Sequence, residues 1–152
     1  IKKNVHLQIL GPEPLSNSFN FKYFKNYLKG KDRNIKNLLM DQKFLSGLGN
    51  IYVNEILFNS KIKPDRPVKK LVDFEICKII ENTKKILKKA IFYGGSTIKD
   101  FSNSSGIKGN FQQQLSVYGR KGNKCTNSKC EGIVKKIILT NRSTFFCSSC
   151  QK

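Results

Sequence analysis

The sequence predicts a mainly α-helical chain that ends in a small β-hairpin carrying clustered cysteines. Three observations lead to this prediction. Apolar side chains recur at helical spacing in several segments between residues 20 and 93, and glycine, proline or asparagine separates these segments. Residues 133–147 instead read as two β-prone runs joined by a short Thr-Asn-Arg turn. Four of the five cysteines fall within residues 125–150, beside those runs.

The composition describes a small and strongly basic chain. Its 152 residues suffice for one domain or two very small ones, and a hydrophobic content of 38% supports a modest core. No apolar run approaches the length of a membrane span, and no signal-peptide pattern opens the sequence, so we expect neither membrane insertion nor secretion. The formal net charge of +19 favours a polyanionic partner, such as nucleic acid or a membrane surface.

Arginine is the more specific part of this charge. Lysine, asparagine and isoleucine are all abundant, which is typical of an AT-rich coding bias and inflates the lysine content without selection for binding. Arginine makes bidentate phosphate contacts that lysine cannot make. The four arginines are Arg33, Arg66, Arg120 and Arg142. The single histidine, His6, is expected in a linker or on the surface, so a hydrolase triad has little support.

Two short helices are expected before residue 45. Residues 1–18 contain the sequence Gly-Pro-Glu-Pro and read as an extended linker. In residues 20–29 apolar side chains recur at helical spacing, and Gly30 ends the helix. Asn34 precedes a second segment with apolar side chains at 35, 38 and 39. Because an asparagine oxygen accepts hydrogen bonds from the free N–H groups at a helix start, Asn34 is a suitable cap.

The segment 45–50, "LSGLGN", interrupts an otherwise helix-prone run. Its two glycines permit positive φ angles and close backbone approach, so we expect two tight turns that join two short helices. Asn50 would then cap the second helix, whose free N–H groups and dipole favour a phosphate group. An ordinary helical hairpin with a glycine-rich connection explains the same residues, and the segment alone leaves both interpretations open.

A longer helix is expected over residues 73–93, with Asp73 as its cap. Apolar residues at 76, 80, 87 and 91 lie roughly on one face, and Cys77 falls within this apolar pattern, so we expect a buried structural thiol there. Residues 96–110 are rich in serine, asparagine and glycine and predict a mobile loop. Residues 111–118 are expected to form a short helix that leads to Gly119-Arg120.

The cysteine spacing indicates a metal site. Cys125-x4-Cys130 and Cys147-x2-Cys150 bracket the predicted hairpin, so four thiolates would meet at one end of it. Four thiolates suit one tetrahedral zinc ion with no open position, which makes the site structural rather than catalytic. Two disulfides are the alternative, but no feature of the sequence indicates an oxidising compartment. Zinc would also stabilise a segment too short to bury a core of its own.

Several stretches, in order along nearly all of the chain, resemble the formamidopyrimidine-DNA glycosylase/endonuclease VIII family of base-excision repair enzymes. The stretches "GGSTIKDF" and "VYGRKG" make the likeness greater to the formamidopyrimidine branch. The matching stretches are "LGPEPL" at 10–15, "LLMDQKFLSGLGNIYVNEILF" at 38–58, "GGSTIKDF" at 94–101, "GNFQQQLSVYGRKG" at 109–122, and the cysteine hairpin that ends in "NRSTFFCSSCQ".

The resemblance implies a fold and a division of the chain. It implies a helix–two-turns–helix DNA-binding domain followed by a four-cysteine zinc ribbon. The linker would span 1–18, the DNA-binding domain 19–117, and the zinc finger 118–152. Residues 96–110 match the loop that closes over the extruded lesion in the family. The family's β-rich N-terminal catalytic domain has no counterpart in these residues.

The resemblance also implies site residues. Asn50 and Arg142 would hold phosphates that flank a flipped-out base, and Arg33 matches a further basic position that contacts DNA. Arg120, within the matched "VYGRKG", is expected to contact DNA as well. Arg142 corresponds to the family's proton donor in the second, δ, elimination. The partner would be damaged double-stranded DNA, bound by a monomer in the cytoplasm or nucleoid.

The family's nucleophile is an N-terminal proline, and this sequence begins with Ile1. Its four prolines are internal, so their nitrogens are tied up in amide bonds and cannot attack a sugar. We therefore expect the C-terminal part of a bifunctional glycosylase and AP lyase that removes oxidised purines, inactive by itself. A non-catalytic module that binds damaged DNA is the alternative. An RNA-binding zinc ribbon is a third interpretation, which the order of the motifs disfavours.

Overall fold

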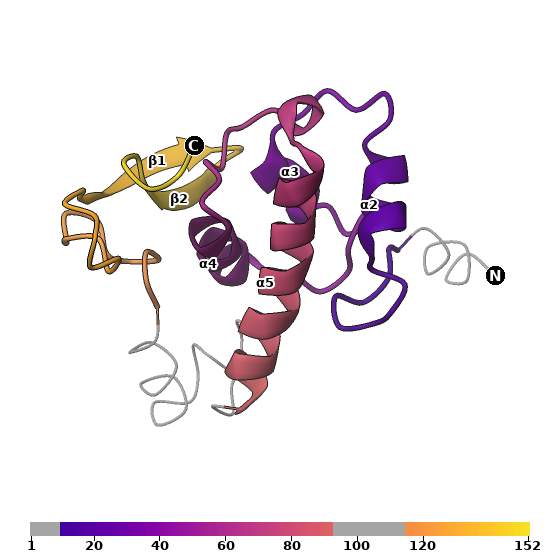
Figure 1. Cartoon of the computed structure of the whole chain (residues 1–152), viewed down its shortest axis with the longest axis horizontal. Coiled ribbons are helices and arrows are strands. Elements are labelled where there is room, and N and C mark those ends of the chain that lie inside the picture. Colours follow the sequence, from indigo (N-terminus) through magenta and orange to yellow (C-terminus); the bar gives the residue numbers. More distant parts are fainter. Residues whose placement is uncertain (1–9, 93–114) are drawn as a thin grey trace.

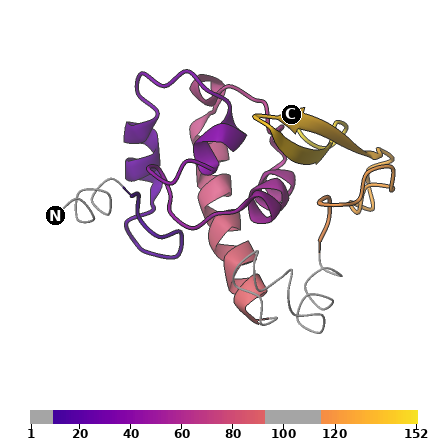
Figure 2. The ribbon, with the colours of Figure 1, turned by 180° about the vertical axis from the view of Figure 1, so that it is seen from behind.

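The computed structural model describes residues 10–92 and 115–152. Figures 1 and 2 show α2 and the hairpin at opposite ends of the described chain, with α3, α4 and α5 between them. This arrangement confirms the predicted mainly α-helical chain with a small hairpin. The elements are α2 (Phe21–Tyr27), α3 (Ile35–Leu39), α4 (Asn50–Ser60), the 3₁₀ helix η1 (Val68–Lys70), α5 (Asp73–Phe92), β1 (Val134–Leu139) and β2 (Arg142–Cys147).

Some predictions lie outside the described residues. They concern His6, the loop over 96–110 and the first part of the helix expected over 111–118. The described remainder of that segment, residues 115–118, is not helical, so this part of the prediction is wrong. Its backbone N–H groups bind a side chain of α4 instead, as described below.

The helix α4 is the centre of the helical part. All of its residues except Asn59 are buried, which is typical of a helix surrounded by other elements. It packs against α3, α5 and β2, so the helices and the hairpin share one support. A cluster of aromatic rings extends this core toward α2, where the Phe24 and Phe44 ring centroids lie 5.0 Å apart in an edge-to-face arrangement.

The helix caps follow the sequence in part. Asn20 and Asn34 cap α2 and α3 through their side chains, and Asn34 Oδ1 accepts from Asn37 N at 2.7 Å. Asn50 does not cap α4, because Gly49 occupies the cap position and Asn50 is the first helical residue. Asp73 is likewise the first residue of α5 rather than its cap. In both cases the helix starts one residue earlier than the polar side chain suggested.

The linker segment is docked onto the turn between α3 and α4. Gly11 N donates to Gln42 O at 2.8 Å, and Ser46 N donates to Pro12 O at 3.0 Å. A Cβ atom at Gly11 would lie 2.3 Å from Phe44 O, so only glycine permits this approach. Gly47 has the positive φ expected for the glycine-rich turn, at +90°, whereas Gly49 has a φ of −104°.

The orientation of α5 corrects two expectations. The buried face of this helix carries residues 76, 79, 83, 87 and 90. Cys77 is exposed rather than buried, and Ile91 is 52% exposed. Each follows a buried residue directly, and one step along an α-helix rotates a side chain by about 100°. Residues 76 and 87 of the predicted face are buried as expected, but packing against α4 and α2 turns Cys77 and Ile91 toward solvent.

The hairpin has a two-residue turn. Leu139 pairs with Arg142, and the turn residues Thr140 and Asn141 have φ angles of +53° and +61°. Positive φ at both positions is typical of a type I′ turn, whose twist matches that of the strands. Arg142 therefore belongs to β2 as its first residue, directly beside the turn. None of the described helices has the length and hydrophobicity that a membrane crossing requires.

Candidate functional site

The four clustered cysteines converge at the end of the hairpin away from its turn. Their sulfur atoms all lie within 4.8 Å of one another, with Cys125 Sγ 3.5 Å from Cys150 Sγ and Cys130 Sγ 3.7 Å from Cys147 Sγ. Thiolates placed about 2.3 Å from a tetrahedral zinc would lie about 3.8 Å apart. None of these cysteines is in a disulfide. The donor set and its spacing therefore fit one tetrahedral metal ion.

The backbone near this cluster leaves room for sulfur. Gly132 N donates to Cys130 Sγ at 3.3 Å, and a Cβ atom at Gly132 would lie 2.7 Å from Cys147 Sγ. Hydrogen bonds with the Cys150 thiol and from Gly132 N–H lower the pKa of Cys130 to about 7. Burial raises the pKa of Cys125 and Cys150, so binding of a metal as thiolates would release protons from these two thiols.

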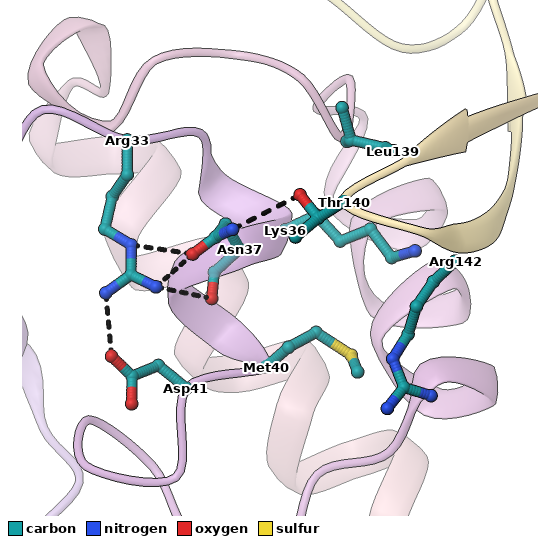
Figure 3. A pocket seen from close by; sticks show the side chains of 8 residues that line it. All are labelled: Arg33, Lys36, Asn37, Met40, Asp41, Leu139, Thr140 and Arg142. Carbon is teal, nitrogen blue, oxygen red and sulfur yellow. Dashed lines mark hydrogen bonds and ion pairs between the residues drawn. The ribbon is translucent and has the colours of Figure 1, made fainter.

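A hollow of about 380 Å³ lies between α3 and the turn of the hairpin. Figure 3 shows that its walls come from two elements far apart in the sequence. Three of its side chains are cationic and one is acidic, so its charge favours an anion. The lining residues are Arg33, Lys36, Asn37, Met40, Asp41, Leu139, Thr140 and Arg142.

Arg142 presents a free cation at this hollow. Its side chain is exposed, and Figure 3 shows the guanidinium beside the hollow with no hydrogen bond to the other lining residues. Within the part of the chain that the structure describes, no carboxylate lies within ion-pair distance of it. The turn directly precedes this residue, and its exposed guanidinium is available for a ligand.

Arg33 is held within the fold. Its Nη1 lies 2.7 Å from Asp41 Oδ2, and its Nε donates to Asn37 Oδ1 at 2.9 Å. Burial tends to raise the pKa of Asp41, but the hydrogen bond and charge of Arg33, with Lys43 N–H, keep this pKa below its usual range. Arg33 therefore faces the hollow with much of its charge already balanced.

Lys36 is a site residue that the sequence analysis missed. Its side chain is buried, and Nζ donates to Thr144 Oγ1 of β2 at 2.6 Å. Burial, with a further contribution from the charge of Arg142, lowers the pKa of Lys36 to about 8. In a lysine-rich sequence, no local pattern distinguishes this lysine from the exposed ones. Its partner lies 108 residues away in the sequence.

Asn50 links the start of α4 to the hairpin. It is buried, and its Nδ2 donates to Ser143 O at 3.0 Å. The carbonyl of Ser143 belongs to the residue that follows Arg142. The two residues predicted to hold phosphates are thus connected through Ser143, although Asn50 does not line the hollow.

Glu55 binds the segment that enters the finger. Its carboxylate accepts from the backbone N–H groups of Ser116, Val117 and Tyr118 at 2.7, 2.8 and 2.9 Å. Burial raises the pKa of Glu55, while these N–H groups and the charge of Arg120 act in the opposite direction. Arg120 does not line the hollow, and its buried Nε has no hydrogen-bond partner among the described residues. Arg120 is therefore separate from the Arg33 and Arg142 pair.

The H2TH domain model of formamidopyrimidine-DNA glycosylase matches residues 10–102. This chain belongs to the formamidopyrimidine-DNA glycosylase family. A formamidopyrimidine-DNA glycosylase of Hydrogenovibrio crunogenus is 41% identical over all of this chain and 54% of its own length. One from Rickettsia bellii is 48% identical over 94% of this chain and 52% of its own length. The chain spans about half the length of the curated relatives that it matches.

Solved structures of this family have the same fold. MutM (Fpg) of Thermus thermophilus superposes with a TM-score of 0.86 at 38% identity, over 99% of this chain and 56% of that one. The Lactococcus lactis enzyme, in a complex with DNA that contains an AP site, superposes with a TM-score of 0.84 at 34% identity. That match covers 100% of this chain and 53% of the Lactococcus chain.

In this member of the formamidopyrimidine-DNA glycosylase family, the described structure brings together part of the predicted site. Arg33 and Arg142 line one hollow, and the four cysteines form one cluster. Asn50 is joined to the same hairpin through Ser143, whereas Arg120 lies elsewhere. The sequence analysis missed Lys36 and Glu55, because each acts on a partner more than 60 residues away.

Proposed function

We propose that residues 1–152 form the DNA-clamping part of a DNA glycosylase and AP lyase of base-excision repair. The proposed substrates of the whole protein are oxidised purines, such as 8-oxoguanine and formamidopyrimidines, in double-stranded DNA. The observation that carries this proposal is the free guanidinium of Arg142 at a cationic hollow. Family membership and the DNA-bound Lactococcus lactis relative support it.

The proposed DNA contacts follow from position and charge. Arg142 would meet a phosphate in a two-pronged contact, and the first turn of α4 at Asn50 would meet another through free N–H groups. Arg33 would add charge at the same hollow, with Asp41 limiting its strength. Arg120 would contact DNA outside the hollow. We also propose Arg142 as the proton donor in δ-elimination.

We propose one structural zinc ion held by Cys125, Cys130, Cys147 and Cys150. The sulfur spacing fits a tetrahedral site, and four protein ligands leave no position for substrate or water. The metal would fix the base of the hairpin, and so the direction in which Arg142 points. It would take no part in the chemistry.

Residues 1–152 by themselves are proposed to bind DNA without excising a base. The four prolines among them are all internal, and an amide nitrogen cannot form a Schiff base. We propose that the protein binds one duplex as a monomer. Since the proposed partner is double-stranded DNA, we propose a cytoplasmic or nucleoid-associated protein.

Binding to damaged DNA tests the proposed function. Fluorescence anisotropy would measure the affinity of residues 1–152 for a duplex that contains a tetrahydrofuran abasic analogue and for the same duplex without the analogue. We expect tighter binding to the abasic duplex. If about four to six phosphates are neutralised, the slope of log K against log salt should be roughly −4 to −5. Equal affinity for both duplexes, or a flat salt dependence, would contradict the proposal.

A further inference from the structure

We propose that Asn54 is a positioning residue that couples the start of α4 to the tip of the hairpin. Through this coupling it would set the relative placement of Asn50 and Arg142, the two proposed phosphate contacts. The inference rests on the proposed function, since it assigns Asn54 a role in DNA binding. Asn54 would not contact DNA itself, because its side chain is completely buried.

The Asn54 amide bonds both elements at once. Its Oδ1 accepts from Phe145 N of β2 at 2.7 Å, and its Nδ2 donates to Asn50 O at 2.7 Å. Nδ2 also lies 3.3 Å from Asn50 Oδ1. The opposite orientation of the amide would place donor against donor and acceptor against acceptor. The two partners therefore determine which way the amide points.

Asn50 completes a link with two points of attachment to β2. Its Nδ2 donates to Ser143 O, while Phe145 N donates to Asn54. Ser143 and Phe145 are two residues apart, so these groups lie on the same edge of the strand. Two asparagines one turn apart on α4 thus take the place of a neighbouring strand along this edge. Buried backbone groups need such partners, and Phe145 is buried.

The two hydrogen bonds between α4 and β2 fix the position of the Arg142 backbone relative to α4. Ser143, the first attached residue, follows Arg142 in the chain, so a shift of the strand edge moves the guanidinium with it. The β-hairpin has two strands and no other sheet partner among the described elements. An apolar side chain at position 54 would keep the volume but leave Phe145 N without its partner. The strand edge would then lose its fixed distance from α4.

The test is a double-mutant cycle on DNA binding. Asn54→Leu should weaken binding to the abasic-analogue duplex by about tenfold. In the Arg142→Ala background, the same substitution should weaken it by less than about threefold, because Asn54 acts through Arg142. Asn59→Leu is the matched control. Asn59 Nδ2 makes the same kind of hydrogen bond to a carbonyl four residues earlier, Glu55 O at 2.8 Å, but the Asn59 side chain is exposed. We expect Asn59→Leu to change DNA affinity by at most twofold.

Hydrogen exchange in the unsubstituted protein gives a second measurement. The Phe145 amide should be protected as strongly as the amides paired between β1 and β2, although it lies on the outer edge of β2. Fast exchange of this amide would overturn the coupling even if Asn54→Leu fails to fold. Equal weakening by Asn54→Leu in both backgrounds would also overturn it. If the unsubstituted protein does not bind the abasic duplex, the proposed function fails, and the exchange measurement still decides whether Asn54 holds β2.

Discussion

Lys36 Nζ lies 2.6 Å from Thr144 Oγ1, so a buried lysine of α3 holds the strand that begins with Arg142. The contact joins two elements that the sequence places more than a hundred residues apart. Its position beside the hollow also gives the proposed DNA site a group that titrates near physiological pH, because burial and the charge of Arg142 lower the pKa of Lys36 to about 8. This leads to the first of four predictions.

DNA affinity should fall as the pH rises from about 7 to 9 at constant salt. A phosphate in the hollow favours the charged form of Lys36 and so raises the pKa of this lysine. DNA binding is therefore coupled to uptake of a proton by Lys36. The affinity falls at a pH where Lys36 of the free protein is already neutral. Anisotropy titrations across this pH range measure the effect. Lys36→Met keeps the length of the side chain and should show a flatter profile. The same pH slope in both proteins would rule out Lys36 as the titrating group.

Arg142→Ala should weaken binding to the abasic-analogue duplex by about 1–3 kcal/mol, which is typical of a lost charge-assisted contact. Zinc content should be unchanged, and the free energy of unfolding should change by no more than about 0.5 kcal/mol, because the side chain is exposed and has no partner in the described structure. In a protein with the family's catalytic half, δ-elimination should be slowed as well. Gel analysis of the cleavage products measures this step.

Lys88→Ala is the control for Arg142. Lys88 is an exposed cation on α5, and Figures 1 and 2 show α5 and α3 on opposite faces of the helical part. Its removal should change DNA affinity by less than about threefold. Equal losses in the two variants would mean that Arg142 contributes only general charge.

Removal of zinc by a chelator should unfold the finger, while the helices stay folded. One zinc per chain is expected by elemental analysis of reduced protein, and strong chelation should remove the amide protection of β1 and β2. The helices should persist, because their buried core is a separate cluster from the one around the cysteines. Far-UV circular dichroism and hydrogen exchange together distinguish these two outcomes. Purified, reduced protein without metal would refute the zinc proposal.

Arg66→Ala should destabilise the fold by about 2 kcal/mol without a specific effect on DNA binding. Its guanidinium bonds both carboxylate oxygens of Glu75 at 2.6 and 2.7 Å, and it also donates to the carbonyls of Lys70 and Lys152. This arginine therefore joins η1, α5 and the end of the finger, and its loss leaves a partly buried carboxylate unpaired. Urea denaturation measures the change.

Lys69→Ala is the matched control for Arg66. Lys69 lies 3.6 Å from Asp32, and both side chains are more than 60% exposed. Surface pairs of this kind contribute little because water screens them. We expect Lys69→Ala to cause no measurable change in the free energy of unfolding. A similar loss of stability in both variants would show that the Arg66 network adds nothing beyond surface charge.

Local features of this protein could be predicted from its sequence. Asn34 caps α3 because its oxygen reaches an N–H group three residues later, and a short turn closes the hairpin because the strands on either side are adjacent in the chain. The turn is one residue shorter than the expected Thr-Asn-Arg turn, since Arg142 pairs with Leu139. The cysteine spacing predicted the cluster for the same reason, since the hairpin brings its own two ends together. Each of these depends on residues within one turn or one hairpin.

Tertiary structure decided the features that depend on distant partners. Asn50 was expected to cap α4, but Ser143 provides a partner for its side chain, and the cap position passed to Gly49. Cys77 lies in an apolar pattern, yet the packing of α5 turns it to solvent. Lys36 has no distinguishing neighbours in sequence, and its burial against β2, together with the charge of Arg142, lowers its pKa. Burial and pairing between remote segments are properties of the packed chain, because periodicity and capping act over a few residues only.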